Sequence, residues 1–141
     1  MRAQPWMLAV LLLFGAVAAR AQQPSDPIGE ALFPPELVMQ NQQAIGLSGE
    51  QKESLKNELR QAQQQFTDLQ WKLQDEVEQM AKLVGQTTVD EKQVLAQLEK
   101  VLTAEREVKR RQIVLLVRIK NLLTAEQQGK LRTLRAGGGK T

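Results

Sequence analysis

Cysteine and histidine are both absent from the 141 residues. The chain therefore has no disulfide, no thiol nucleophile and no imidazole proton shuttle, and it lacks the two side chains that hold most protein zinc. The sequence also shows no Gly-rich phosphate loop and no nucleophile elbow. We expect no catalytic residues, no metal ligands and no cofactor, and enzyme function ranks last.

Aromatic residues are few, at 4% of the chain, and glycine and proline occur mainly near the ends and at a few joints. Gln, Leu, Glu, Lys and Ala fill the middle of the sequence, and this composition favours long helices. Without its leader the chain has about 120 residues, which suits one small domain with a single core. The composition predicts an all-α fold.

The first 21 residues have the features of a signal peptide. Arg2 precedes an apolar run of 14 residues from Trp6 to Ala19, which is shorter than the roughly 20 residues of a membrane span. Ala19-Arg20-Ala21 fits the small-x-small rule for cleavage before Gln22. We expect export to a bacterial periplasm, with an uncleaved membrane anchor as the alternative. No cysteine follows the run, so lipoprotein processing is excluded.

Charge is distributed unevenly along the mature chain. Residues 22–90 contain 11 acidic and 5 basic residues, a net charge of −6, and residues 91–141 contain 5 acidic and 12 basic residues, a net charge of +7. The two halves can neutralise each other in the folded protein, or the basic half can remain open for a partner. Nucleic acid is a poor candidate partner, because the cations are local and the chain is exported.

Capping signals divide the chain into four predicted helices. Residues 22–33 are interpreted as a flexible arm, and a short helix follows Pro34 and Pro35 and stops at Gly46. Ser48 and Gln51 form a capping box that starts a long helix ending at Gly85. Its predicted inward stripe comprises Leu55, Leu59, Ala62, Phe66, Leu69, Leu73, Val77, Met80 and Val84.

The short joint after Gly85 makes the second long helix antiparallel to the first. Thr88 and Glu91 are predicted to cap this helix, which runs from about Val89 to Leu122. Thr124 and Gln127 form another capping box for a last short helix, and residues 136–141 are predicted to be a disordered tail. The predicted inward face of the second long helix comprises Val94, Leu95, Leu98, Val101, Leu102, Leu116, Ile119 and Leu123. Glu105, Lys109 and Gln112 interrupt this face, which suggests a hairpin that is splayed or wet at its centre.

Trp71 does not belong to the stripe of the first long helix. At 100° per residue it points away from the stripe, toward a polar face, and a large exposed indole needs cover. A second subunit, the short first helix or a transient partner could supply that cover.

Six residues of the second long helix form a surface that we call the basic flank, where arginines border aliphatic side chains. One hairpin cannot bury both flanks of the apolar run that begins at Ile113, so the flank is either part of a homodimer interface or a surface for client polypeptides. The basic flank comprises Arg106, Arg110, Ile113, Val114, Val117 and Arg118.

Two segments match the pattern L-[TS]-x-x-Q and bracket the predicted hairpin. They are Leu47-Ser48-Gly49-Glu50-Gln51 and Leu123-Thr124-Ala125-Glu126-Gln127. The pattern and its placement resemble the Spy/CpxP family of periplasmic stress proteins and the related heavy-metal resistance proteins and sensors. The resemblance covers residues 34–135, and it implies a four-helix, cradle-shaped antiparallel dimer that binds unfolded or aggregation-prone proteins without ATP.

The resemblance leaves two main hypotheses. In the first, the chain is an ATP-independent periplasmic chaperone whose client-binding residues are the basic flank and Trp71. In the second, it is a heavy-metal sensor or resistance protein, or a regulator that binds the periplasmic domain of a sensor kinase. Carboxylates with Met39 or Met80 would make only a weak, poorly selective site for zinc, nickel or copper. A coiled-coil structural protein without a client is a third possibility.

Overall fold

The computed structural model describes residues 26–138, and within this range the chain is helical and contains no strand. The helices are α1 (Pro27–Ala31), α2 (Pro35–Gln40), α3 (Gly49–Val84), α4 (Glu91–Leu122) and α5 (Ala125–Gly137). The predicted all-α class and the four predicted helices, α2 to α5, are confirmed. The predicted signal peptide, residues 22–25 of the arm and the last three residues of the predicted tail lie outside the described range.

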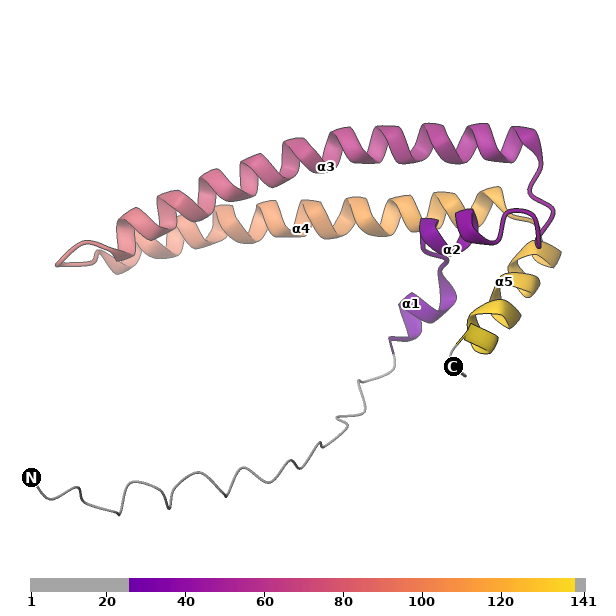
Figure 1. The fold of residues 1–141 in the computed structure, drawn as a ribbon. Coiled ribbons are helices and arrows are strands. Elements are labelled where there is room, and N and C mark those ends of the chain that lie inside the picture. The colour runs from indigo at the N-terminus through magenta and orange to yellow at the C-terminus, as the bar shows by residue number, and fades with distance from the viewer. Residues whose placement is uncertain (1–25, 139–141) are drawn as a thin grey trace, which may run out of the picture.

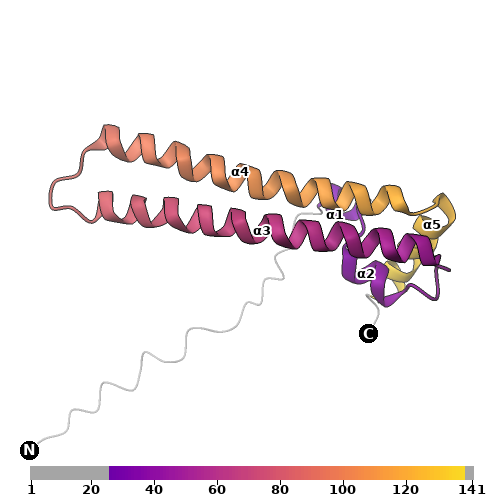
Figure 2. The same ribbon diagram turned by 90° about the horizontal axis from the view of Figure 1, so that it is seen from above.

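Helices α3 and α4 form a long antiparallel hairpin that dominates the molecule (Figures 1 and 2). Helix α3 has 36 residues and is therefore about 54 Å long. It starts where predicted, because the Ser48 hydroxyl accepts from the Gln51 amide and the Gln51 side chain accepts from the Ser48 amide. It ends at Gly85, also as predicted.

The predicted cap of α4 is wrong by two residues. Asp90, not Thr88, is the N-cap, and its carboxylate accepts from the Gln93 amide at 3.2 Å. A carboxylate satisfies the free amide and also carries negative charge beside the positive end of the helix dipole, so it is the better cap.

The predicted inward face of α4 is also wrong in part. The seam against α3 is formed by buried Gln97, Val101 and Ala104, whereas Leu98 and Leu102 are 37% and 39% exposed. Gln97 donates to the backbone oxygen and the carboxylate of Glu76, at 2.8 and 2.7 Å. Because Glu105, Lys109 and Gln112 lie off this seam, their polarity does not require a splayed hairpin. Alanine at 104 lets the helices approach closely, and the Gln97 bonds fix their register.

Helices α1, α2 and α5 all lie at one end of the hairpin, beside the start of α3 and the end of α4 (Figures 1 and 2). Here Ile119 of α4 and Leu123, which follows α4, pack with Phe33, Val38 and Leu131 in the hydrophobic core. The flexible arm predicted for residues 22–33 is wrong for residues 27–33, because 27–31 form α1 and Leu32 and Phe33 are buried. The prediction is based on two prolines and one glycine, which indicate a loop, but tertiary contacts order this segment.

The turn between α2 and α3 depends on Gly46. Its φ of +67° is left-handed, a conformation that L side chains avoid. The amide of Leu47 donates to the carbonyl of Gln42 at 2.9 Å, and that of Gly46 donates to Gln43 at 3.1 Å, which is the Schellman pattern. The turn aims the Gly46 carbonyl at α5.

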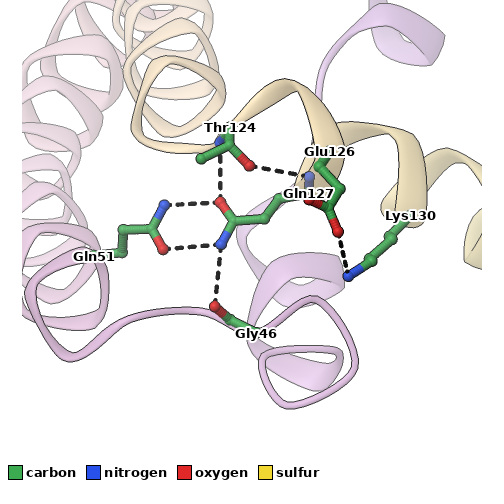
Figure 3. Close-up of polar contacts among 6 residues, drawn as sticks. All are labelled: Gly46, Gln51, Thr124, Glu126, Gln127 and Lys130. Atoms are coloured by element: carbon green, nitrogen blue, oxygen red, sulfur yellow. Dashed lines mark hydrogen bonds and ion pairs between the residues drawn. The ribbon is translucent and has the colours of Figure 1, made fainter.

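The two LTxxQ segments meet at this end of the hairpin and bind each other (Figure 3). The Gln51 amide donates to Gln127 Oε1 at 2.8 Å, and the Gln127 amide donates to Gln51 Oε1 at 2.9 Å. Each amide oxygen also caps its own helix, by accepting from Ser48 or Thr124. Each amide nitrogen also donates to a main-chain carbonyl.

These carbonyls belong to the end of α4 and to the turn between α2 and α3. Gln51 donates to Leu122 at the end of α4, at 2.7 Å, and Gln127 donates to Gly46, at 3.3 Å. The pair thus joins the start of α3, the end of α4, the α2–α3 turn and the start of α5. Gln127 is buried, and no buried side-chain N or O in the described chain lacks a partner.

We predict that Gln127→Leu lowers the free energy of unfolding by about 2–4 kcal/mol, because it leaves the Gln51 amide, the Thr124 amide and the Gly46 carbonyl without their partner. Urea denaturation followed by circular dichroism measures this loss. The same change at exposed Gln64 on α3 is the control and should stay within about 0.5 kcal/mol of the original protein. A loss at residue 127 no larger than at residue 64 would contradict the role of the glutamine pair.

Candidate interaction surface

The structure leaves most of the basic flank open to solvent. Arg106, Arg110 and Val117 of α4 are exposed, and Ile113 and Val114 are half-buried. Arg110 lies 3.7 Å from the carboxylate of Glu107, one turn earlier on the same helix. Such an exposed pair is weak, so Arg110 is free to meet another molecule.

Arg118 is placed differently from the other members of the flank. Its guanidinium forms an ion pair with Glu58 of α3 at 3.1 Å, and the neighbouring Arg111 donates to Gln65 of α3 at 3.4 Å. These contacts cross the hairpin between its acidic and basic halves. Part of the predicted mutual neutralisation therefore occurs, while Arg106 and Arg110 remain directed away from α3.

Trp71 is 62% exposed, as its position off the stripe predicts. It follows Ala62 by nine residues, or two and a half turns, so it points to the opposite side of α3. Ala62 lines a small surface hollow together with Arg111 and Leu115 of α4. Trp71 therefore lies on the edge of the hairpin away from α4, and the structure does not bring it together with the basic flank in one chain.

The structure also exposes an apolar surface that the sequence reading assigned to the core. On α4, Leu98 precedes Leu116 by 18 residues, and Leu95 precedes Ile113 by the same interval, which is five helical turns. Leu116 and Ile113 lie beneath α1. Leu95 and Leu98 thus continue the side of α4 that α1 covers, but they lie beyond its reach, and Leu95 is 53% exposed.

The same relation holds on α3. Leu73 and Val77 follow Leu55 and Leu59 by 18 residues, and the latter two pack in or against the core. Val77 is 47% exposed, and Leu73 is half-buried. One side of the hairpin is therefore covered by the short helices at one end and open at the other. We call the open part the distal face, which comprises Leu73, Val77, Leu95, Leu98 and Leu102.

The distal face and the basic flank adjoin along α4. Arg106 follows Leu102 by one turn, and Arg110 follows Arg106 by another. Glu105 and Lys109 occupy the next positions on the distal side of the helix, so the apolar surface ends at a charged margin. The arrangement offers apolar contacts beside cations.

The sequence carried a signal for the distal face. An apolar position on α4 can face either α3 or the side covered by the short helices. Residues 18 apart lie on the same side of a helix, so Leu98 lies on the side of Leu116. The predicted inward face, which is centred on Leu98, combines residues from both sides of α4. The interval from Leu98 to Leu116 marks a surface that the short helices can cover only in part.

The carboxylates of the described chain do not form a metal centre. Within residues 26–138 no group of three or more Asp or Glu side chains could hold a metal ion, and His and Cys are absent from the sequence. The hydrogen bond from Lys56, helped by its charge, lowers the pKa of Glu53, and Lys130 acts in the same way on the pKa of Glu126 (Figure 3). Both are solvent-exposed pairs within a single helix. The donor set does not fit a zinc, nickel or copper ion.

A family model described as heavy-metal resistance matches residues 7–130. The chain belongs to the heavy-metal resistance family. This family is related to Spy and CpxP, so the resemblance drawn from the two LTxxQ segments is confirmed. Searches among curated proteins and among solved structures gave no match.

Members of the heavy-metal resistance family are typically periplasmic. Across residues 26–138, no helix combines the length and the apolar character needed to cross a membrane. The structure shows the helical-hairpin fold, and the family match shows the family to which the chain belongs.

We predict that the fluorescence of Trp71 in a chain of residues 22–141, which has no other tryptophan, is that of an indole in water. Acrylamide should quench it almost as efficiently as it quenches a free tryptophan derivative, because most of the Trp71 side chain is open to solvent. The measurement is repeated over a range of protein concentrations. A blue shift and protection that grow with concentration would show that a second subunit covers Trp71.

Proposed function

We propose that this protein is an ATP-independent, chaperone-like protein of the periplasm that holds unfolded or aggregation-prone polypeptides. The supporting observation is the distal face, an apolar surface on a charged hairpin that the short helices leave uncovered. Isolated exposed leucines are ordinary on a protein surface, but a line of them beside cations is typical of an interaction site. The predicted cleavage of the leader after Ala21 belongs to the same proposal.

The size of the distal face suits transient holding. Full burial of one Leu or Val side chain contributes about 1.5–3 kcal/mol, and association itself costs several kcal/mol in lost freedom of motion. Five partly exposed side chains therefore support a weak, reversible complex. Release then needs no nucleotide, in keeping with a sequence that has no phosphate-binding loop.

The cations beside the distal face supply the other half of the proposal. Arg106, Lys109 and Arg110 present positive charge along α4, which speeds encounter with acidic segments of an unfolded chain. Apolar contacts then hold the bound segment. Capture should slow as ionic strength rises, since solvent-exposed charges are screened.

Two further partners remain part of the proposal. A homodimer would place the distal faces or Trp71 of two chains together, and the periplasmic domain of a sensor kinase is another candidate for the same helical surface. Both would compete with a client for the distal face, so each would reduce client binding.

We predict that the mature chain suppresses aggregation of a heat-unfolded or reduced protein at near-stoichiometric amounts. Leu98→Asp combined with Leu102→Asp should weaken client binding about tenfold or more, because two apolar contacts become charged. Light scattering and fluorescence anisotropy with an unfolded, labelled polypeptide measure the two effects. No suppression by the unmodified chain would refute the chaperone function.

The control for this pair is Leu134→Asp on α5, since Leu134 is exposed to a similar degree, 39%, and lies outside the distal face. It should leave binding unchanged. Arg110→Glu with Val117→Asp tests the basic flank separately. If this second pair abolishes binding and the leucine pair does not, the flank rather than the distal face carries the activity.

The second candidate function, heavy-metal sensing or resistance, is favoured by the description of the family. We predict that isothermal titration with Zn²⁺, Ni²⁺ and Cu²⁺ shows no binding at micromolar concentration, because the chain offers only scattered carboxylates and thioethers. Micromolar or tighter binding of any of the three ions would place metal sensing first.

A further inference from the structure

Helix α1 forms the roof of a cavity on the same side of the hairpin as the distal face. The cavity has a volume of about 300 Å³. Ile28 and Leu32 line it from the α1 side, and Lys109, Gln112, Ile113 and Leu116 line it from α4. Since Ile113 and Leu116 lie five turns beyond Leu95 and Leu98, α1 covers apolar residues on the same side of α4 as the distal face, beyond the charged margin at Glu105 and Lys109.

The roof itself is packed loosely. Helix α1 contains no buried residue, and Ile28 is 60% exposed although it borders an apolar cavity. Burial begins only after the helix, at Leu32 and Phe33. The segment 26–33 is therefore anchored at its C-terminal end and lies over α4 without filling the space beneath it.

Polar contacts to the main chain hold the anchored end. The guanidinium of Arg135 on α5 donates to the carbonyls of Gly29, at 3.3 Å, of Glu30, at 2.9 Å, and of Leu32. The same guanidinium lies 5.4 Å from the centre of the Phe33 ring. Lys120 of α4 donates to the Ala31 carbonyl at 2.9 Å.

These contacts satisfy the carbonyls at the end of α1 with two cations. Charge-assisted bonds of this kind are strong, yet they involve only one end of a short segment and can be replaced by water when the segment lifts. Local opening of such a weakly packed element requires far less free energy than unfolding of the hairpin.

We propose that residues 26–31 are a displaceable strap, hinged at buried Leu32 and Phe33, that covers apolar residues of α4 on the same side as the distal face and gives way to bound polypeptide. The proposal rests on the chaperone function proposed above and assigns its regulation. With the strap closed, the client has the distal face alone. With the strap lifted, Ile113 and Leu116 add a second apolar surface on the same side of α4, beyond the charged margin at Glu105 and Lys109. Arg135 sets the balance between the two states.

The absence of cysteine allows a direct test of strap opening. Leu116→Cys places a single thiol beneath the strap, and its rate of reaction with a maleimide reports how often the strap lifts. Adding Arg135→Ala should raise this rate about tenfold or more, because the main-chain carbonyls of the strap lose their charged donor. Exposed Arg132 on the same helix is the matched control, and Arg132→Ala should leave the rate unchanged.

A second measurement asks whether the strap and the client use the same surface. Reduced and alkylated lysozyme serves as the unfolded polypeptide, and its affinity is measured by fluorescence anisotropy. Arg135→Ala should bind it severalfold more tightly than the original chain. A chain with Ile28→Cys and Leu116→Cys, its two thiols joined by a short bismaleimide, should bind it more weakly than the same chain with both thiols singly capped. Circular dichroism verifies that each variant keeps its helical fold.

The outcomes separate the two proposals. An unchanged labelling rate in Arg135→Ala overturns the strap, whatever the chain binds. Faster labelling without any change of affinity in the Arg135→Ala or cross-linked chains shows that the strap opens but does not regulate the site, which also overturns the proposal. If no form of the chain binds the unfolded polypeptide, the chaperone function fails and exchange with a client fails with it, while the labelling rate still reports the opening.

Discussion

The fold depends on the reciprocal amide pair between Gln51 and Gln127. Each side chain caps its own helix, binds the other and reaches one further main-chain carbonyl, so two amides join four segments that are distant in sequence. The core formed around Phe33, Ile119 and Leu131 can assemble only when those segments meet. The LTxxQ pattern is therefore explained by structure: the glutamine is required for a buried joint, and the Ser or Thr before it for the start of a helix.

Because all the short helices lie at one end of the hairpin, the apolar residues at its other end remain exposed. The short helices cover one side of the hairpin at one end, whereas apolar residues occur on that side near both ends (Figures 1 and 2). The remainder, from Leu73 to Val77 on α3 and from Leu95 to Leu102 on α4, is exposed because no element of the described chain reaches it. The candidate binding surface thus results from helices that are longer than the part that the short helices cover, and basic residues of α4 border it.

Local signals in the sequence predicted the elements well, and tertiary arrangement much less so. Ser48, Gln51, Thr124 and Gln127 mark helix starts by short-range hydrogen bonding, so those boundaries could be predicted. The cap at Asp90 was missed because Thr88 offers the same chemistry two residues earlier. Helix α1 was missed because its stability comes from Arg135, more than a hundred residues away. The seam of α4 was misplaced because periodicity shows that a position is apolar but does not show which neighbour will cover it.

The length of the hairpin beyond its cover has a consequence for how the molecule moves. Near the amide pair, the turns of α3 and α4 contact the core and the short helices. Toward Gly85, the two helices contact only each other along the seam, where Gln97 donates hydrogen bonds to Glu76. Resistance to local opening should therefore decline along the hairpin from the joined end to the tip. The surface offered to partners lies on the more pliable part, so the two helices can shift slightly to match bound chains of different shape.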